Sequence, residues 1–298
     1  MVRLLAVLLV LFAVHRAEAA INVFACEPEW GALAEEIGGE AVSVYVATSA
    51  KQDPHQLQAR PSLIAKARSA DLVVCTGAEL EIGWMPVILR QAANGKIQPG
   101  TPGYFEAAAQ VRLKDVPTVL DRSQGDVHAQ GNPHIQTDPR TLVPVAAALA
   151  ERLMQIDPGN AARYRERHQA FTQRWSQALQ RWQMEAASLK GTKVAVQHKN
   201  WTYLIDWLGL VEVTTLEPKP GVPPSSGHLA EVLAKVTADP VRLVIRAAYE
   251  DGRPSVWLAE RARVPAVELP FTVGGNDQAT DLTRLYDDTL RRLKDAVR

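Results

Sequence analysis

Three histidines in this 298-residue chain share a context that suits metal binding. His55 follows the strand-like segment 42–47, His134 precedes a helical segment, and His198 follows the strand-like segment 193–197. Imidazole nitrogen suits zinc, copper, nickel and iron, whereas calcium and magnesium prefer oxygen ligands. Three histidines leave a fourth position for a carboxylate or a water molecule. The residue types predict a transition-metal site, although a solvated loop position is the more common fate of any single histidine of this kind.

The segments around these histidines alternate between strand-like and helical patterns. In the first half, the strand-like runs are 21–25, 42–47 and 71–75, and the helical runs are 30–37 and 61–69. After Gly191 the strand-like runs are 193–197, 211–215, 241–247 and 266–269, and the helical runs are 201–208, 228–236, 254–262 and 281–297. This alternation predicts an α/β fold with parallel sheets covered by helices on both faces. Ligands of such sheets bind beyond the carboxyl ends of the strands.

A long helix is expected between the two α/β halves. After a helix over 141–154, residues 160–189 contain neither proline nor glycine, and apolar residues recur there every three or four positions. About thirty residues at 1.5 Å each span roughly 45 Å, which suits a rod joining two lobes. We therefore expect a signal peptide at 1–19, a first lobe at 20–157, a connecting helix at 158–189 and a second lobe at 190–298. His168 lies on this helix and reads as a packed or partly exposed residue rather than a ligand.

The N-terminus has the pattern of a cleavable signal peptide. A positive start, an apolar run of about a dozen residues and the small residues Ala17 and Ala19 predict cleavage after Ala19. A retained anchor or a buried strand is the alternative. The first cysteine, Cys26, comes too late after the apolar run for a lipoprotein, which favours a freely soluble periplasmic protein. Cys26 and Cys75 both end strand-like runs, so either a disulfide or two buried thiols is expected.

The charge balance excludes some partners. Lysine plus arginine equals aspartate plus glutamate, at 33 each, so nothing favours nucleic acid or an anionic membrane surface.

Several motifs together resemble one known family. They are Asp53-Pro54-His55 with Arg60-Pro61-Ser62, the stretch 70–81, Asn132-Pro133-His134, Asp157-Pro158, and 194–198 followed by Trp201, Tyr203-Leu204 and Leu208-Gly209-Leu210. In order and spacing, the chain is similar to the periplasmic solute-binding proteins of zinc and manganese ABC importers. The likeness covers essentially the whole mature chain. One departure is Asn132, where the family usually has an aspartate.

The resemblance implies two α/β lobes joined by a rigid helix, with a metal buried between them. It carries the first three ligand positions onto His55, His134 and His198. Zinc members typically have histidine at the third position and manganese members glutamate, so Zn²⁺ is the expected metal, in line with nitrogen-rich coordination. The expected partner is the membrane permease of an ABC importer. A periplasmic metallochaperone is a second candidate partner, and a monomer is the expected assembly.

The fourth ligand stays open in this sequence. The family usually has an aspartate shortly after the last strand, and here Thr272 aligns with it. Asp277, Glu250 or water are the alternatives, but a helix-capping Asp277 and a hydrogen-bonded Glu250 explain those residues as well. Asp53 and Asp206 are candidate partners for the histidine nitrogens that do not bind metal.

A second departure from the family is the short loop around 121–131. Zinc members often carry a histidine-rich insert there. His128 is expected to be a mobile, solvated residue, with transient metal holding or delivery as the alternative.

Two other functions fit three histidines. One is a manganese or iron carrier on the same scaffold. The other is a zinc hydrolase, in which the metal lowers the pKa of a bound water. No dedicated general base accompanies the histidines, so we expect a binding protein rather than an enzyme.

Overall fold

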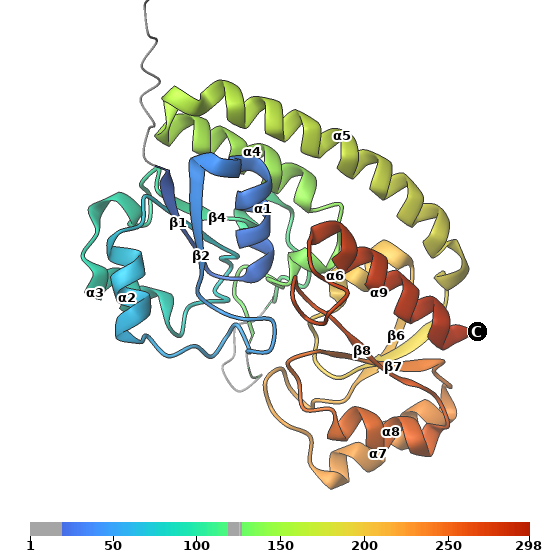
Figure 1. Cartoon of the computed structure of the whole chain (residues 1–298). Coiled ribbons are helices and arrows are strands. Elements are labelled where there is room, and N and C mark those ends of the chain that lie inside the picture. The colour runs from blue at the N-terminus through green and yellow to red at the C-terminus, as the bar shows by residue number, and fades with distance from the viewer. Residues whose placement is uncertain (1–19, 119–124, 126) are drawn as a thin grey trace, which may run out of the picture.

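The structure is a computed structural model, and it describes residues 20–118, 125 and 127–298. The signal peptide expected at 1–19 lies outside these residues. Two lobes lie side by side, and a long helix runs along both (Figure 1). Within the described part of the chain, no helix is long and apolar enough to cross a membrane.

The first lobe is built on a parallel sheet with the strand order β2-β1-β3-β4. Its strands are β1 (Ile21–Ala25), β2 (Val42–Val46), β3 (Leu72–Cys75) and β4 (Tyr104–Glu106). Its helices are α1 (Pro28–Gly38), α2 (Pro61–Arg68) and α3 (Met85–Ala92). Neighbouring residues of a strand point to opposite faces, so Val23 packs with α1 and Phe24 packs with α2 and α3. The sheet is therefore covered on both faces, as the sequence predicts.

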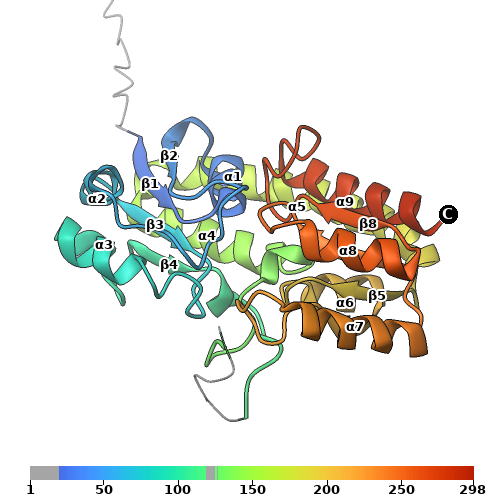
Figure 2. The same ribbon diagram turned by 90° about the horizontal axis from the view of Figure 1, so that it is seen from below.

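The second lobe repeats this plan with the strand order β6-β5-β7-β8, again all parallel. Its strands are β5 (Lys193–Val196), β6 (Val211–Thr215), β7 (Leu243–Ala247) and β8 (Ala266–Leu269). Its helices are α6 (Thr202–Leu208), α7 (Ser226–Ala238), α8 (Arg253–Ala262) and α9 (Leu282–Val297). Figure 2 shows α7 and α8 on one side of this sheet, with α9 and the long helix on the other.

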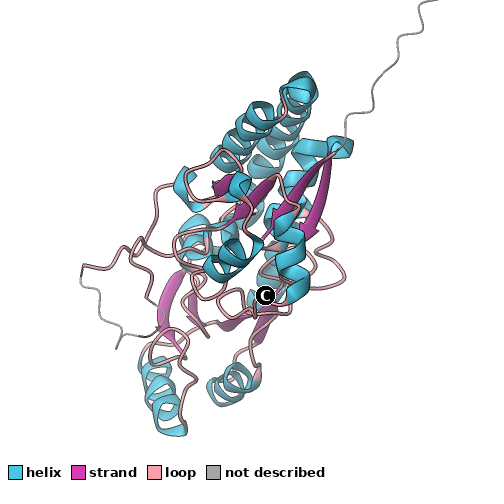
Figure 3. Ribbon diagram, turned by 90° about the vertical axis from the view of Figure 1, so that its left-hand side faces the viewer, coloured by secondary structure: helices cyan, strands magenta, loops and turns pink. Residues whose placement is uncertain are grey.

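The long helix is α5 (Ala161–Ala186), preceded by α4 (Leu142–Ile156). Its 26 residues span about 39 Å at 1.5 Å each. The buried stripe on α5 joins a single apolar core that also contains Val23 of the first lobe and Val194 of the second. Helices α4 and α5 pack next to each other along one side of the molecule (Figure 1, Figure 3). The lobes are thus tied by a shared core rather than by a flexible linker.

Two short elements are absent from the sequence-based expectation. Helix α3 has eight residues and strand β4 has three. Proline follows the first residue of α3, and an apolar run this short has no readable period. Strand β4 is held by its pairing with β3, and α3 packs against α2 and the same sheet.

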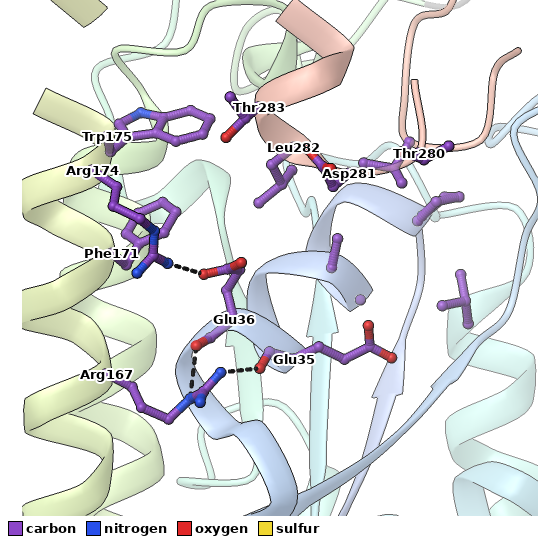
Figure 4. A pocket seen from close by; sticks show the side chains of 15 residues that line it. Glu35, Glu36, Arg167, Phe171, Arg174, Trp175, Thr280, Asp281, Leu282 and Thr283 are labelled. Atoms are coloured by element: carbon purple, nitrogen blue, oxygen red, sulfur yellow. Dashed lines mark hydrogen bonds and ion pairs between the residues drawn. The ribbon is translucent and has the colours of Figure 1, made fainter. Parts of the chain in front are cut away.

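A cavity of about 390 Å³ lies where α1 and α5 meet the segment before α9 (Figure 4). Among the residues that line it, Arg167 of α5 donates to the main-chain oxygens of Glu36 at 3.0 Å and Glu35 at 3.3 Å. Arg174 pairs with the Glu36 carboxylate at 2.6 Å. The lining of this cavity includes no histidine. These contacts fasten the first lobe to the connecting helix.

Candidate metal centre

The structure brings His55, His134 and His198 together between the lobes. His55 lies in the loop between β2 and α2, His134 stands just ahead of the short turn Ile135–Thr137 that leads to α4, and His198 follows β5. One ring nitrogen from each histidine lies within 4.8 Å of the others. The ring centroids are 5.3 to 6.0 Å apart. This spacing allows one ion to contact all three rings.

The histidine cluster is shielded from solvent and carries unused nitrogen atoms. His134 is 2% exposed, and the side chains of His55 and His198 are 10% exposed. Nε2 of His55 and Nδ1 of His134 are buried and have no hydrogen-bond partner. Buried polar atoms are normally paired, so these two nitrogens indicate a missing partner such as a metal ion.

A carboxylate orients the ring of His55. Asp53 Oδ1 lies 2.7 Å from His55 Nδ1 and accepts the main-chain N–H of the same residue at 3.0 Å. Burial raises the pKa of Asp53, but the hydrogen bond and charge of His55 outweigh burial and lower it overall. Trp84 donates from its indole nitrogen to the Pro54 main-chain oxygen at 2.9 Å, which holds the loop in place. The expectation that Asp53 partners a histidine is confirmed.

His198 has a carboxylate partner that the sequence did not suggest. Glu217 Oε2, just after β6, lies 2.6 Å from His198 Nδ1. Burial lowers the pKa of His198, but the hydrogen bond and charge of Glu217 outweigh it and raise the pKa above its ordinary value. The parallel pairing of β5 with β6 places both residues at the same sheet edge. Holding Nδ1 leaves Nε2 of the ring available for a metal.

His134 is positioned by a residue that bridges the lobes. The side-chain oxygen of Asn132 accepts the main-chain N–H of His134 at 3.0 Å. The Asn132 amide donates to the Lys199 main-chain oxygen at 2.9 Å, and Tyr203 donates to the Asn132 main-chain oxygen at 2.7 Å. Burial, followed by the charges of neighbouring histidines, lowers the pKa of His134 well below its usual range. The ring is therefore neutral and able to bind metal at neutral pH.

Neither of the two carboxylates considered for the fourth position belongs to the group of histidine nitrogens within 4.8 Å. Asp277 is exposed in a turn that Asn276 fastens to α9, through a 2.8 Å hydrogen bond to Asp288. Glu250 accepts the main-chain N–H of Ala247 at 2.6 Å, close enough to His198 for their charges to interact but outside the 4.8 Å group. Burial raises the pKa of Glu250 to about 7.

Thr272, which aligns with the family's aspartate, is buried and turns to a different partner. Its hydroxyl donates to Glu29 Oε2 at 2.5 Å. The Thr272 hydroxyl is therefore a hydrogen-bond donor to the buried carboxylate of Glu29 on α1. The fourth ligand stays a prediction, with Asp277, Glu250 and water as the alternatives raised from the sequence.

Two further expectations need correction. Asp206 does not partner a histidine, because it lies half-exposed in ion pairs with Lys114 at 3.1 Å and Arg140 at 2.9 Å. His128 is not a free, solvated residue, because its ring packs 5.3 Å from His55 and 6.5 Å from His134 between centroids. Its pKa is lowered to about 4 by burial first and then by the charges of His55 and His198.

The two cysteines form a disulfide between the ends of β1 and β3. The Cα atoms of Cys26 and Cys75 are 4.8 Å apart. Of the two expectations for this pair, the disulfide is confirmed and the two free thiols are excluded.

Two α/β lobes joined by a long helix, with histidines gathered between them, define a metal-binding substrate-binding protein of an ABC transporter. The sequence matches the family described as "Zinc-uptake complex component A periplasmic" over residues 23–296, and the chain belongs to this family. The crystal structure of ZnuA has the same fold, with a TM-score of 0.76 and 21% identity over 94% of this chain and 100% of that one.

Curated relatives extend this likeness to proteins named for several metals. The metal ABC transporter substrate-binding lipoprotein ScbA of Streptococcus cristatus is 21% identical over 85% of this chain and 80% of its own length. The zinc-binding lipoprotein AdcA of Streptococcus pneumoniae is 22% identical over 70% of this chain and 42% of its own length. Other relatives are named for manganese or iron. These are substrate-binding proteins rather than enzymes, which confirms the expectation of a non-enzymatic protein and sets the hydrolase reading aside.

Proposed function

We propose that this protein captures Zn²⁺ on His55, His134 and His198 and delivers it to the membrane permease of an ABC importer. One observation carries the proposal. Nitrogens of three histidines converge within 4.8 Å between the lobes, and two of the ring nitrogens are buried without a partner. In this assignment residues 20–157 and 190–298 are the lobes that enclose the metal, and 158–189 join them.

Zinc is favoured by the chemistry of the donors. All three side chains offer nitrogen, and neutral imidazole suits zinc better than manganese, which prefers oxygen ligands. Asp53 and Glu217 lie behind two of the rings and add basicity without entering the 4.8 Å group. A manganese or iron carrier is the second candidate, because relatives named for those metals share the family.

The decisive experiment measures metal content and competitive affinity of the purified protein for Zn²⁺, Mn²⁺ and Fe²⁺. We expect one zinc per chain and a preference for zinc. The triple variant His55→Ala, His134→Ala, His198→Ala should bind no zinc at this site, whereas His168→Ala on α5 should behave as the unaltered protein. If the triple variant retained more than half of the zinc, the proposal that these three histidines bind it would be wrong. A clear preference for manganese or iron would replace the zinc assignment.

We also infer that the protein works in the periplasm after cleavage behind Ala19 and is not a lipoprotein. The relatives ScbA and AdcA are named lipoproteins, so this point needs its own support. Lipid attachment uses a cysteine sulfur, and that of Cys26 is joined to Cys75. Intact mass measurement of the exported chain should give Ala20 as the first residue with no added lipid. A lipid-modified Cys26 would overturn the inference.

Partners are expected in line with this role. The family works with permeases and ATPases of ABC transporters. A periplasmic metallochaperone that supplies zinc is a further candidate, testable by zinc transfer between purified proteins. We expect a monomer by light scattering.

A further inference from the structure

His128 is the one site histidine that the three-ligand assignment does not use. Its ring centroid lies 5.3 Å from that of His55, the same separation as between His55 and His134. It also lies 6.5 Å from that of His134. A cavity of about 190 Å³ is lined by His128, His134 and His198 together. Three imidazoles therefore line one small space, and the ring of His55 lies beside that of His128.

The segment carrying His128 is held against the first lobe. Glu79 accepts the main-chain N–H of Ala129 at 2.7 Å. Gly131 donates from its main-chain nitrogen to the His128 main-chain oxygen at 3.1 Å, closing a tight turn. The main chain of Ala78 and Glu79 lies near the His128 side chain and counteracts the lowering of its pKa by burial. A histidine whose one nitrogen is occupied by main chain has the other nitrogen free for a metal.

The ring spacings can be compared with those of a four-histidine zinc site. Zinc–nitrogen bonds of about 2.0–2.1 Å to four tetrahedrally arranged imidazoles place neighbouring ring centroids about 5 Å apart. The separations around His55 are 5.3 Å to His134, 5.3 Å to His128 and 6.0 Å to His198. The nitrogens of His128 lie outside the 4.8 Å group of the other three. The ring of His128 is farther from that of His134, at 6.5 Å, so zinc binding by all four rings requires the turn to move inward.

We propose that His128 is the fourth zinc ligand, so that the loaded site contains four histidines and no carboxylate. Thr272 of the second lobe offers no carboxylate to the metal, and His128 of the first lobe takes the fourth position instead. The inference rests on zinc binding by the other three histidines.

The test compares His128→Ala with His228→Ala, a histidine on α7 whose ring lies near Glu231 rather than in the cluster. Zinc affinity is measured by competition with a chelator, and zinc X-ray absorption counts the bound imidazoles. For the unaltered protein and for His228→Ala we expect four imidazoles. For His128→Ala we expect three imidazoles, one zinc per chain and an affinity at least about tenfold weaker, since loss of even an outer hydrogen-bond partner commonly costs 10–100-fold.

The outcomes separate the two proposals. Three imidazoles plus an oxygen ligand in the unaltered protein, with His128→Ala unchanged in affinity, would overturn the role of His128 and leave the three-histidine site standing. Zinc retained by the triple variant of His55, His134 and His198 would overturn the site itself. The imidazole count of the unaltered protein needs no variant, so a folding defect in His128→Ala cannot obscure the result. Co²⁺ substitution provides a second readout, because the visible spectrum of tetrahedral cobalt changes when one nitrogen donor is replaced by water.

Discussion

At the residue scale, the site separates the atoms that bind metal from the atoms that hold the rings. Asp53 and Glu217 each occupy Nδ1 of a histidine, at 2.7 and 2.6 Å. This contact selects the tautomer, sets the ring orientation and raises the basicity of the remaining nitrogen. The neutral state of His134 comes instead from burial. Carboxylates therefore orient the rings of His55 and His198, whereas burial keeps the ring of His134 neutral.

Replacing Glu217 by glutamine should weaken zinc binding by about tenfold at pH 8, because His198 loses the charge that makes it a strong donor. The same charge raises the pKa of His198, so protons compete with zinc for this ring as the pH falls through that value. In Glu217→Gln the pKa of His198 drops and proton competition weakens. The affinity gap between the two proteins should therefore narrow from about pH 8 to about pH 6, around the ordinary histidine pKa.

Competition titrations across this range check the prediction. Glu231→Gln, which alters an exposed carboxylate 3.6 Å from His228, is the matched control and should bind zinc as the unaltered protein does. Equal affinities of Glu217→Gln and the unaltered protein at every pH would contradict the role given to Glu217.

Asn132 offers a prediction that runs against the family pattern. Its amide donates to the Lys199 main-chain oxygen at 2.9 Å and lies 3.3 Å from an Asp115 carboxylate oxygen. Asn132→Asp removes the donor and places a negative charge beside two acceptors, although aspartate is the usual family residue. We expect a loss of about 1–3 kcal/mol in unfolding free energy at pH 8, measured by urea denaturation. A variant as stable as the unaltered protein would show that the bridge between the lobes contributes little.

The three proposed ligands could be predicted from the sequence, but their surroundings could not. His55, His134 and His198 stand beside prolines or strand ends, and these are local signals. Glu217 is 19 positions from His198, and its contact depends on the pairing of two strands. His128 sits in a loop with no periodic pattern, so only the folded chain reveals its place beside His55.

At the element scale, α5 connects the lobes through aromatic side chains. Trp182 is fully buried and packs against Trp175 and Tyr286, with ring centroids 5.2 Å away in both cases. Its indole nitrogen donates to Asp287 of α9 at 2.6 Å. Trp182 of the connecting helix thus contacts both an aromatic residue seven positions earlier on α5 and the terminal helix of the second lobe.

Trp182→Ala should destabilise the protein by about 3–5 kcal/mol, because it opens a cavity in this packed core and removes one donor to Asp287, which keeps its 2.6 Å contact with Arg181. Met184 lies two positions along on the same helix and is 72% exposed, so Met184→Ala serves as the control with a change of less than about 0.5 kcal/mol. Denaturant unfolding followed by circular dichroism measures both. Similar stabilities of the two variants would contradict the contribution of Trp182 to the packing of α5 against α9.

Elements with a long apolar repeat could be predicted from the sequence, and elements too short to show a repeat could not. The apolar stripe of α5 repeats over seven turns, so its existence and type follow from the sequence, with its ends within a few residues of 159 and 189. The eight residues of α3 and the three of β4 are too few to show a period. Their conformation is set by neighbouring strands and helices.

At the scale of the whole molecule, the shared core limits how the lobes can move. Side chains of both sheets and of α5 belong to one buried cluster. A wide hinge opening would expose that apolar surface, at a cost of about 25 cal/mol for each Å². Metal entry and release are therefore expected to use the loops at the strand ends, where His55, His128 and His198 lie.

A set of buried carboxylates near the disulfide should also make the unfolding free energy of the whole protein depend on pH. Glu27, Glu29 and Glu81 are 2–5% exposed. Burial raises the pKa of Glu29 and Glu81 to about 7 and that of Glu27 well above its ordinary value. Glu81 Oε1 accepts the main-chain N–H of Thr76 at 2.7 Å and that of Gly77 at 3.4 Å, so a single amide oxygen at this place can keep both contacts.

Glu81→Gln should therefore stabilise the protein increasingly as the pH rises. Between the unfolded pKa near 4.5 and the folded pKa of about 7, the folded chain holds a proton on Glu81 that the unfolded chain releases. The stability that Glu81 contributes is present below that window and is lost as the pH rises through it. Glutamine carries no charge at any pH, so the variant should match the unaltered protein near pH 5 and exceed it by about 1–3 kcal/mol near pH 8, at 1.4 kcal/mol per pKa unit.

Urea denaturation at both pH values measures this difference, with Glu40→Gln, at an exposed position between α1 and β2, as the control. A gap between Glu81→Gln and the unaltered protein that is independent of pH would mean that Glu81 is already ionised in the folded chain at pH 5. The proton would then reside on Glu27, its hydrogen-bonded neighbour, and Glu27→Gln would show the pH-dependent gap instead.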